Sequence, residues 1–203
     1  MADLATYSFT RADANPLPNP PWVGVTGFVA LKVLTNKAVA SIASNDCWGV
    51  HGNGGVTWPA DQYSAIILGA VGGSDCGPVI HVDAANTHGY MCTGFSTTDV
   101  GLYEIVSGGF ANLATSGAST YSTSSEIYLE AKVSGANKIV KVFNGGAEII
   151  SFTDTSPRAT GTPGLFHFDG TSGTASWRGG DFSGAAADAY LTMQPLRPAS
   201  GRR

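Results

Sequence analysis

Residues 126–133, EIYLEAKV, decide the fold class of this 203-residue chain. Their odd-numbered positions are apolar and their even-numbered positions are more polar, which is the period-2 pattern of a half-buried β-strand. Residues 134–137 (SGAN) then turn the chain into a second strand at 138–143, and residues 144–146 (NGG) turn it into a third at 147–152. Asn and Gly tolerate the positive φ angles that hairpin turns require. The sequence therefore predicts an antiparallel three-stranded meander here.

The rest of the chain repeats short apolar stretches between turn residues, without a long stretch of helical apolar spacing. Further strands are predicted at residues 28–34, 38–43, 62–71, 78–83, 90–95, 102–107, 110–114, 165–168 and 174–182. About a dozen strands with no helices between them indicate an all-β sandwich or barrel and exclude a parallel βαβ architecture. We expect less than about a tenth of the chain to be helical, against a base rate near one third.

The composition excludes several classes of partner. Only 13% of the residues are charged, whereas about 25% is usual for a soluble domain. The surface is therefore built largely from 27 Gly, 19 Ser and 19 Thr. A net charge of −4 supplies no basic field for nucleic acid. The longest apolar stretch, residues 65–71, is far shorter than the roughly 20 residues of a membrane helix, so no membrane partner is expected.

The first residues and the three cysteines predict a protein with reduced thiols that is not secreted. Residues 1–20 contain neither a basic segment nor an apolar segment of a secretory signal. Cys47, Cys76 and Cys92 are odd in number and form no C-x-x-C pair. We therefore expect reduced, buried thiols rather than a disulfide framework or a zinc knuckle.

Four stretches carry a resemblance to a known fold family. They are residues 9–17 (FTRADANPL) followed by Trp22, residues 58–63 (WPADQY), the strand–turn–strand–Asn-Gly unit at 127–146, and residues 161–165 (GTPGL) followed by 177–182 (WRGGDF). Their order resembles a concanavalin A-like lectin/glucanase, or laminin-G-like, jelly roll, and the resemblance spans about residues 7–184. The variety without a signal peptide is similar to modules of tailed-bacteriophage virion proteins. The resemblance implies a single-domain antiparallel jelly-roll β-sandwich.

The resemblance implies that an enzymatic member would cleave β-glucans with paired carboxylates on one strand, and this pattern is missing from the sequence. The Arg, Gln-x-His and Tyr-x-Lys sets of polysaccharide lyases of similar fold are missing as well. Retention needs two carboxyl groups about 5–5.5 Å apart and inversion about 6.5–9.5 Å. Glu126 and Glu130 share a strand face, but four residues of strand rise separate their Cα atoms by about 13 Å. We interpret them as part of a solvated sheet face. No catalytic residue, cofactor or metal is therefore predicted, although His81-Val82-Asp83 and His167-Phe168-Asp169 each place an imidazole and a carboxylate on one face.

Aromatic residues are the remaining candidates for binding. Trp22, Trp58 and Trp177 lie in the stretches that match the family pattern, so we expect them to pack within the sandwich. Trp48 lies among polar residues at 45–53 (NDCWGVHGN), which we interpret as a loop. Trp48, together with His51 and Asn53, is therefore the predicted contact for a glycan or a protein interface. Packing of Trp48 in the interior is an equally weighted alternative.

The chain is divided into three segments by composition. Residues 1–24 hold an N-terminal strand and a proline-rich arm, residues 25–184 hold the jelly roll, and residues 185–203 form a docking tail. The tail carries spaced apolar residues and terminal arginines, namely Leu191, Met193, Leu196, Arg197, Arg202 and Arg203. We expect it to bind other virion subunits, including copies of the same chain.

Two functions follow from these observations. The main expectation is a non-enzymatic structural protein of a phage virion, made in the host cytoplasm, either decorating the capsid or forming part of the tail. The alternative is a carbohydrate-binding module that recognises host or environmental glycans. An exposed aromatic platform with Asn or Asp partners would favour the second.

Overall fold

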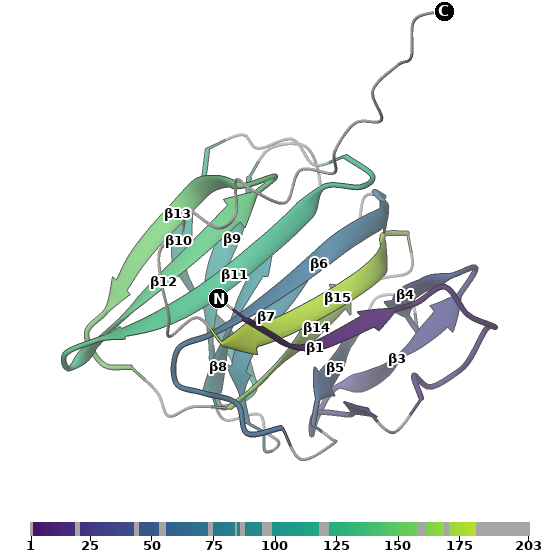
Figure 1. The fold of residues 1–203 in the computed structure, drawn as a ribbon, viewed down its shortest axis with the longest axis horizontal. Coiled ribbons are helices and arrows are strands. Elements are labelled where there is room, and N and C mark those ends of the chain that lie inside the picture. Colours follow the sequence, from purple (N-terminus) through teal and green to yellow (C-terminus); the bar gives the residue numbers. More distant parts are fainter. Residues whose placement is uncertain are drawn as a thin grey trace, which may run out of the picture.

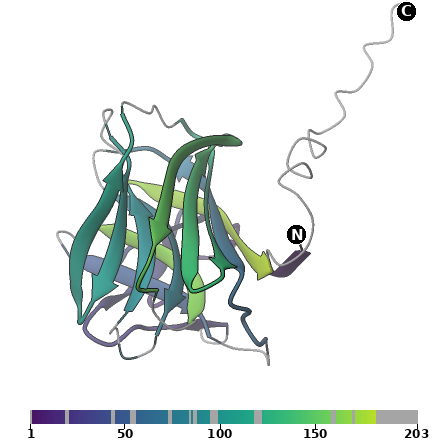
Figure 2. The same cartoon turned by 90° about the vertical axis from the view of Figure 1, so that its left-hand side faces the viewer.

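The structure, a computed structural model, describes residues 2–18, 21–42, 45–52, 56–72, 75–83, 85, 88–94, 99–117, 122–157, 161–168 and 171–181. Its regular elements across these ranges are all β-strands, arranged in two layers (Figures 1 and 2). The all-β jelly-roll sandwich expected from the sequence is confirmed. Within the same ranges there is no helix of a length and apolarity that would cross a membrane.

One layer, which we call sheet A, carries the meander predicted from residues 126–133. Across it lie β13 (Ala147–Asp154), β12 (Asn137–Asn144), β11 (Glu126–Ser134), β6 (Gln62–Ala70) and β15 (Gly173–Asp181). The far side of β15 pairs with β1 (Ala2–Ser8) and, at Thr174, with β4 (Lys37–Ala40). The last strand of the chain that is described therefore lies beside the first.

The second layer, sheet B, lies behind sheet A in Figure 1. Across it lie β10 (Gly109–Thr115), β9 (Gly101–Val106), β8 (His88–Thr93), β7 (Cys76–Val82), β14 (Thr162–Phe168), β5 (Asp46–His51) and β3 (Val29–Leu34), with β2 (Trp22–Val23) beside β5. Strand β3 pairs antiparallel with β4 and, over two residue pairs, parallel with β5. It therefore joins the two layers along one edge.

Strand β5 is the main departure from the predicted elements, because residues 45–53 were interpreted as a loop. The strand is buried along almost its whole length, on both faces. A strand buried on both faces shows no alternation of polar and apolar residues. The polar residues at its start therefore concealed a central strand of sheet B.

The main hydrophobic core lies between the layers and contains all three cysteines. Cys47, Cys76 and Cys92 are free and fully buried, as expected. Trp22 and Trp177 are buried in the same core and Trp58 packs against it, which confirms the packing role predicted for the three. A second apolar cluster, with Trp48 and Phe166 at its centre, covers the other face of sheet B.

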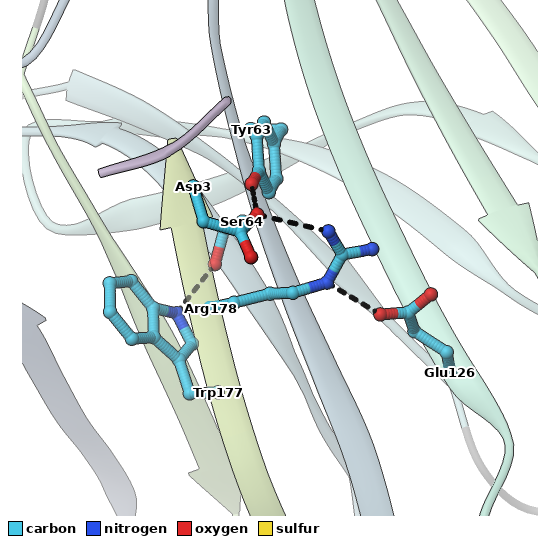
Figure 3. Close-up of polar contacts among 6 residues, drawn as sticks. All are labelled: Asp3, Tyr63, Ser64, Glu126, Trp177 and Arg178. Carbon is cyan, nitrogen blue, oxygen red and sulfur yellow. Dashed lines mark hydrogen bonds and ion pairs between the residues drawn. The ribbon is translucent and has the colours of Figure 1, made fainter. Parts of the chain in front are cut away.

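Trp177 connects the two sheets by hydrogen bonds as well as by packing. Its Nε1 donates to Ser64 Oγ at 2.9 Å and to the Gly164 carbonyl at 3.2 Å, and Ser64 Oγ donates to the same carbonyl at 2.7 Å (Figure 3 shows the pair of side chains). Ser64 and Trp177 belong to sheet A, whereas Gly164 belongs to β14 of sheet B. A buried polar group without a partner is costly, so this triangle fixes how the sheets face each other.

Two buried histidines and one buried glutamate make stability depend on pH. Burial lowers the pKa of His81 and of His167 to about 3, and for His81 the ammonium of Lys138, 2.9 Å from Nδ1, acts in the same direction. The unfolded chain binds these protons near pH 6.5 and the folded chain only near 3. Burial raises the pKa of Glu130 to about 7, so its effect has the opposite sign.

The variant Ser64→Ala should lose about 1–3 kcal/mol of stability, because a buried acceptor and donor disappear from the triangle at once. Urea denaturation measures this loss. The matched control is Ser151→Ala on the exposed side of β13, which should stay within about 0.5 kcal/mol of the parent. Equal effects of the two changes would contradict the structural role given to Ser64.

The free energy of unfolding should fall as the pH drops from 6.5 towards 3. In this range His81 and His167 become protonated in the unfolded chain but stay neutral in the folded chain. Each such group contributes a slope of up to about 1.4 kcal/mol per pH unit. Denaturation of His167→Gln across this range should give a shallower slope. Glu130→Gln should give a steeper slope between pH 4.5 and 7, because it removes the opposing effect. Slopes that match the parent in both variants would refute this assignment.

Candidate functional site

Strand alternation places Arg178 on the outer face of sheet A. Its neighbour Trp177 points into the core, so Arg178 projects from the opposite face. In the sheet register Arg178 lies between Thr6 of β1 and Ala65 of β6, and Tyr128 of β11 lies beyond Ala65. Residues far apart in the sequence therefore meet on one surface.

The guanidinium of Arg178 is bound by two carboxylates on opposite sides (Figure 3). Its Nε lies 2.8 Å from Glu126 Oε1 and its Nη1 lies 3.2 Å from Asp3 Oδ1. The hydroxyl of Tyr63 donates to the same oxygen of Asp3. These contacts join strands β1, β6, β11 and β15, and they hold the three charged groups in a fixed array.

Two tyrosine rings lie beneath this array. Tyr63 and Tyr128 stack with their centroids 5.0 Å apart, and the guanidinium carbon of Arg178 lies 5.4 Å and 5.9 Å from the two centroids. Such cation–π contacts stabilise the cation and orient its plane. Burial, assisted by the hydrogen bond to Asp3, raises the pKa of Tyr63, so its hydroxyl stays protonated and remains a donor.

A groove of about 240 Å³ runs beside the array on the outer face of sheet A. Nine residues line it, namely Thr6, Tyr7, Ser8, Ala65, Ile67, Glu126, Ser176, Trp177 and Arg178. The side chains of Tyr7 and Trp177 pack on the core side of the sheet, and the others include three hydroxyls and the charged pair. We call this groove the Arg178 groove. Arg178 and Glu126 are each partly exposed there, at 26% and 21% of their side-chain surface. They can therefore contact a bound molecule without moving apart.

The expectation that Glu126 and Glu130 belong to a solvated sheet face is wrong for Glu130. The side chain shares the outer face with Glu126, as predicted, but Glu130 is only 5% exposed. It lies opposite Tyr63 on β6 and Lys141 on β12. Burial raises its pKa to about 7. The face is therefore a packed polar and aromatic surface, and its two glutamates have different environments.

The surface contact predicted at Trp48 and His51 is also corrected. Trp48 lies within β5 and is fully buried, and His51 is 7% exposed. His51 stacks on Trp177 with centroids 5.1 Å apart, and burial lowers its pKa. The cause is again that β5 is central in sheet B. Asn53, the third member of the predicted contact, lies outside the described residues.

Trp48 forms an aromatic cluster whose outer members reach the surface. Its ring is nearly parallel to those of Phe28 and Phe110, at centroid distances of 4.6 and 6.2 Å. Phe110 is 39% exposed. The exposed ring of this cluster is therefore Phe110 of β10, whereas Trp48 packs in the interior.

The other predicted residues are not brought together into a site. His81 is fully buried against Lys138, and Asp83 instead lies 3.7 Å from His88 Nδ1. In the part of the chain that the structure describes, no three His, Cys, Asp or Glu side chains are grouped to hold a metal ion. Asp169 and the six predicted tail residues, Leu191, Met193, Leu196, Arg197, Arg202 and Arg203, lie outside the described ranges.

Sequence reasoning did not select Asp3, Tyr63 or Arg178 as site residues. The sequence does hold one indication that Arg178 is exposed. It directly follows Trp177, which was expected to pack in the core, so its side chain must lie on the opposite face of the strand. The contact of Arg178 with Asp3, 175 positions earlier, has no such indication.

Comparisons with known proteins identify the fold but no family. No family model matches the chain, and no curated protein matches it. Among solved structures, the carbohydrate-binding module CBM66 from Bacillus subtilis aligns with a TM-score of 0.57 and 15% identity, over 76% of this chain and 91% of that chain.

Two further structures align over 90% of this chain with a TM-score of 0.52. One is the GH43 protein BlXynB from Bacillus licheniformis, at 12% identity, of which the chain spans 40%. The other is a protein of unknown function from Shewanella oneidensis MR-1, at 11% identity and 88% of its length. Identities this low show a shared β-sandwich fold alone.

Proposed function

We propose that this chain is a non-catalytic carbohydrate-binding module and that the Arg178 groove is its glycan site. The observation that carries the proposal is the fixed array of Asp3, Glu126 and Arg178 beside a groove lined by hydroxyls. The fold likeness to a carbohydrate-binding module, most of whose length the chain covers, supports the proposal. It favours the glycan-binding alternative over the virion role expected first from the sequence.

The chemistry of the groove suits a saccharide. Sugar hydroxyls both donate and accept hydrogen bonds, and the groove offers carboxylate acceptors, guanidinium donors and the hydroxyls of Thr6, Ser8 and Ser176. Ile67, which is 36% exposed, offers an apolar contact to the C–H face of a sugar ring. Ion pairs hold the charged groups before any ligand arrives, which reduces the cost of ordering side chains on binding.

The arrangement of the carboxylates supports binding rather than hydrolysis. A glycosidase places its two carboxyl groups on either side of the scissile bond. Asp3 and Glu126 instead lie on either side of the Arg178 guanidinium, and both accept its hydrogen bonds. They are therefore positioned to orient a cation, and to accept from ligand hydroxyls at the edge of the groove.

Glycan arrays followed by titration calorimetry test the site. Glu126→Ala should weaken binding of the best glycan by ten- to a hundredfold, because a hydrogen bond to a charged group is worth about 1.5–3 kcal/mol. Thr6→Trp should abolish binding by filling the groove from the exposed edge strand β1. Both variants should unfold near the parent temperature, since partly exposed ion pairs contribute about 1 kcal/mol or less.

Lys141→Gln is the matched control for these variants. Lys141 forms a 2.6 Å ion pair with Glu148 on the same face of sheet A but does not line the groove. The Lys141→Gln variant should therefore bind the glycan as tightly as the parent protein does. Binding that survives both groove variants would place the site elsewhere, and an array without any bound glycan would refute the function.

The role as a virion subunit, with other subunits as partners, stays a separate prediction that rests on the tail sequence. Deleting residues 189–203 should leave the sandwich folded, because the described strands end at Asp181. The same deletion should abolish self-association or particle binding, which analytical ultracentrifugation and co-sedimentation measure. Unchanged assembly of the truncated chain would contradict the docking role of Leu191, Met193, Leu196 and the three arginines.

A further inference from the structure

The charges around the Arg178 groove decide which class of glycan it accepts. Of the nine residues that line it, Arg178 is the one cation and Glu126 the one anion. A second carboxylate, Asp3, also binds Arg178. The three groups together carry a charge of about −1, so the guanidinium is already more than neutralised.

The neighbouring charges on the same face do not reverse this balance. The stem of Lys37 lies against Gly69, but its ammonium donates to the Thr35 carbonyl at 3.4 Å, and Lys37 does not line the groove. Lys141 is paired with Glu148 at 2.6 Å. Lys132 projects from the same face of β11, but Glu130 separates it from Tyr128 and the groove, and Lys132 itself is exposed. The whole chain carries a net charge of −4. An anionic ligand would therefore approach an acidic protein at an acidic site.

A carboxylate or sulfate group could bind in the groove in two arrangements, and both are unfavourable. It would displace Glu126 or Asp3 from Arg178 and leave that carboxylate partly desolvated without its partner, or it would lie beside both carboxylates. Like charges in close contact cost several kcal/mol at a binding interface. A neutral sugar meets neither penalty, because its hydroxyls donate to the same carboxylates.

Resting on the glycan-binding function proposed above, we infer that the Arg178 groove takes uncharged saccharides and discriminates against glycans that carry carboxylate or sulfate groups. Glu126 and Asp3 are the residues that set this specificity. They do so by repulsion of the acidic ligand as well as by hydrogen bonding to the neutral one.

A matched pair of ligands tests the inference. The neutral glycan that binds best on the array is compared with the same glycan after its primary hydroxyls have been oxidised to carboxylates. Calorimetry at 20 mM NaCl should show at least tenfold weaker binding of the oxidised form. At 500 mM NaCl the difference should shrink because salt screens the repulsion, while binding of the neutral form should hardly change.

Isosteric variants assign the effect to the two carboxylates. Asp3→Asn and Glu126→Gln should each reduce the preference for the neutral form, and the double variant should reduce it further, whereas Lys141→Gln should not. Equal or tighter binding of the oxidised glycan by the parent protein would overturn the inference while leaving the groove a glycan site. Failure of both forms to bind would refute the proposed function itself, and the inference with it. The salt series on the unaltered protein decides the matter even if a variant does not fold.

Discussion

The contacts of Trp177 in the core constrain the groove on the other side of the sheet. Its indole N–H binds Ser64 and Gly164, and this fixes β15 against both β6 of the same sheet and β14 of the other. Because successive side chains of a strand point to opposite faces, Arg178 is then forced outward. A residue that stabilises the fold therefore positions the residue on which the candidate site is built.

The site depends equally on the pairing of the first described strand with the last. Asp3 reaches Arg178 only because β1 runs antiparallel beside β15 (Figure 1). The register of this pair puts Thr6 opposite Arg178. Tyr63 holds the same carboxylate from β6. Four strands thus share one network of polar contacts, and the groove exists only in the folded sandwich. This explains how a surface with few charged residues holds Asp3, Glu126 and Arg178 in fixed positions.

Sequence patterns predicted most strands, including β7, which is buried along its whole length, but not β5. The meander around residues 126–133 was predictable because one face of each strand is more polar and the turns contain Asn and Gly. Strand β5 was not, since neighbours cover both of its faces and its polar start resembles a loop. The surface contact predicted for Trp48 followed from that loop interpretation, and the equally weighted alternative, packing in the interior, is the one that the structure shows. Phe110, the exposed ring of the same aromatic cluster, lies on β10, a strand that was predicted without any role for this ring.

The site was less predictable than the fold, because its residues are related by register rather than by spacing. Glu126 and Glu130 were correctly placed on one face, yet their environments differ. Strand β15 supplies Arg178, which binds Glu126, and strand β6 supplies Tyr63, which lies opposite Glu130. Charged residues are scarce in this chain, at 13% of the total. Asp3 and Glu126 nevertheless both contact the guanidinium of Arg178, and this array lies beside the groove. The placement of Asp3 and Glu126 on either side of Arg178 therefore depends on the register of β1, β6, β11 and β15, which no single stretch of the sequence shows.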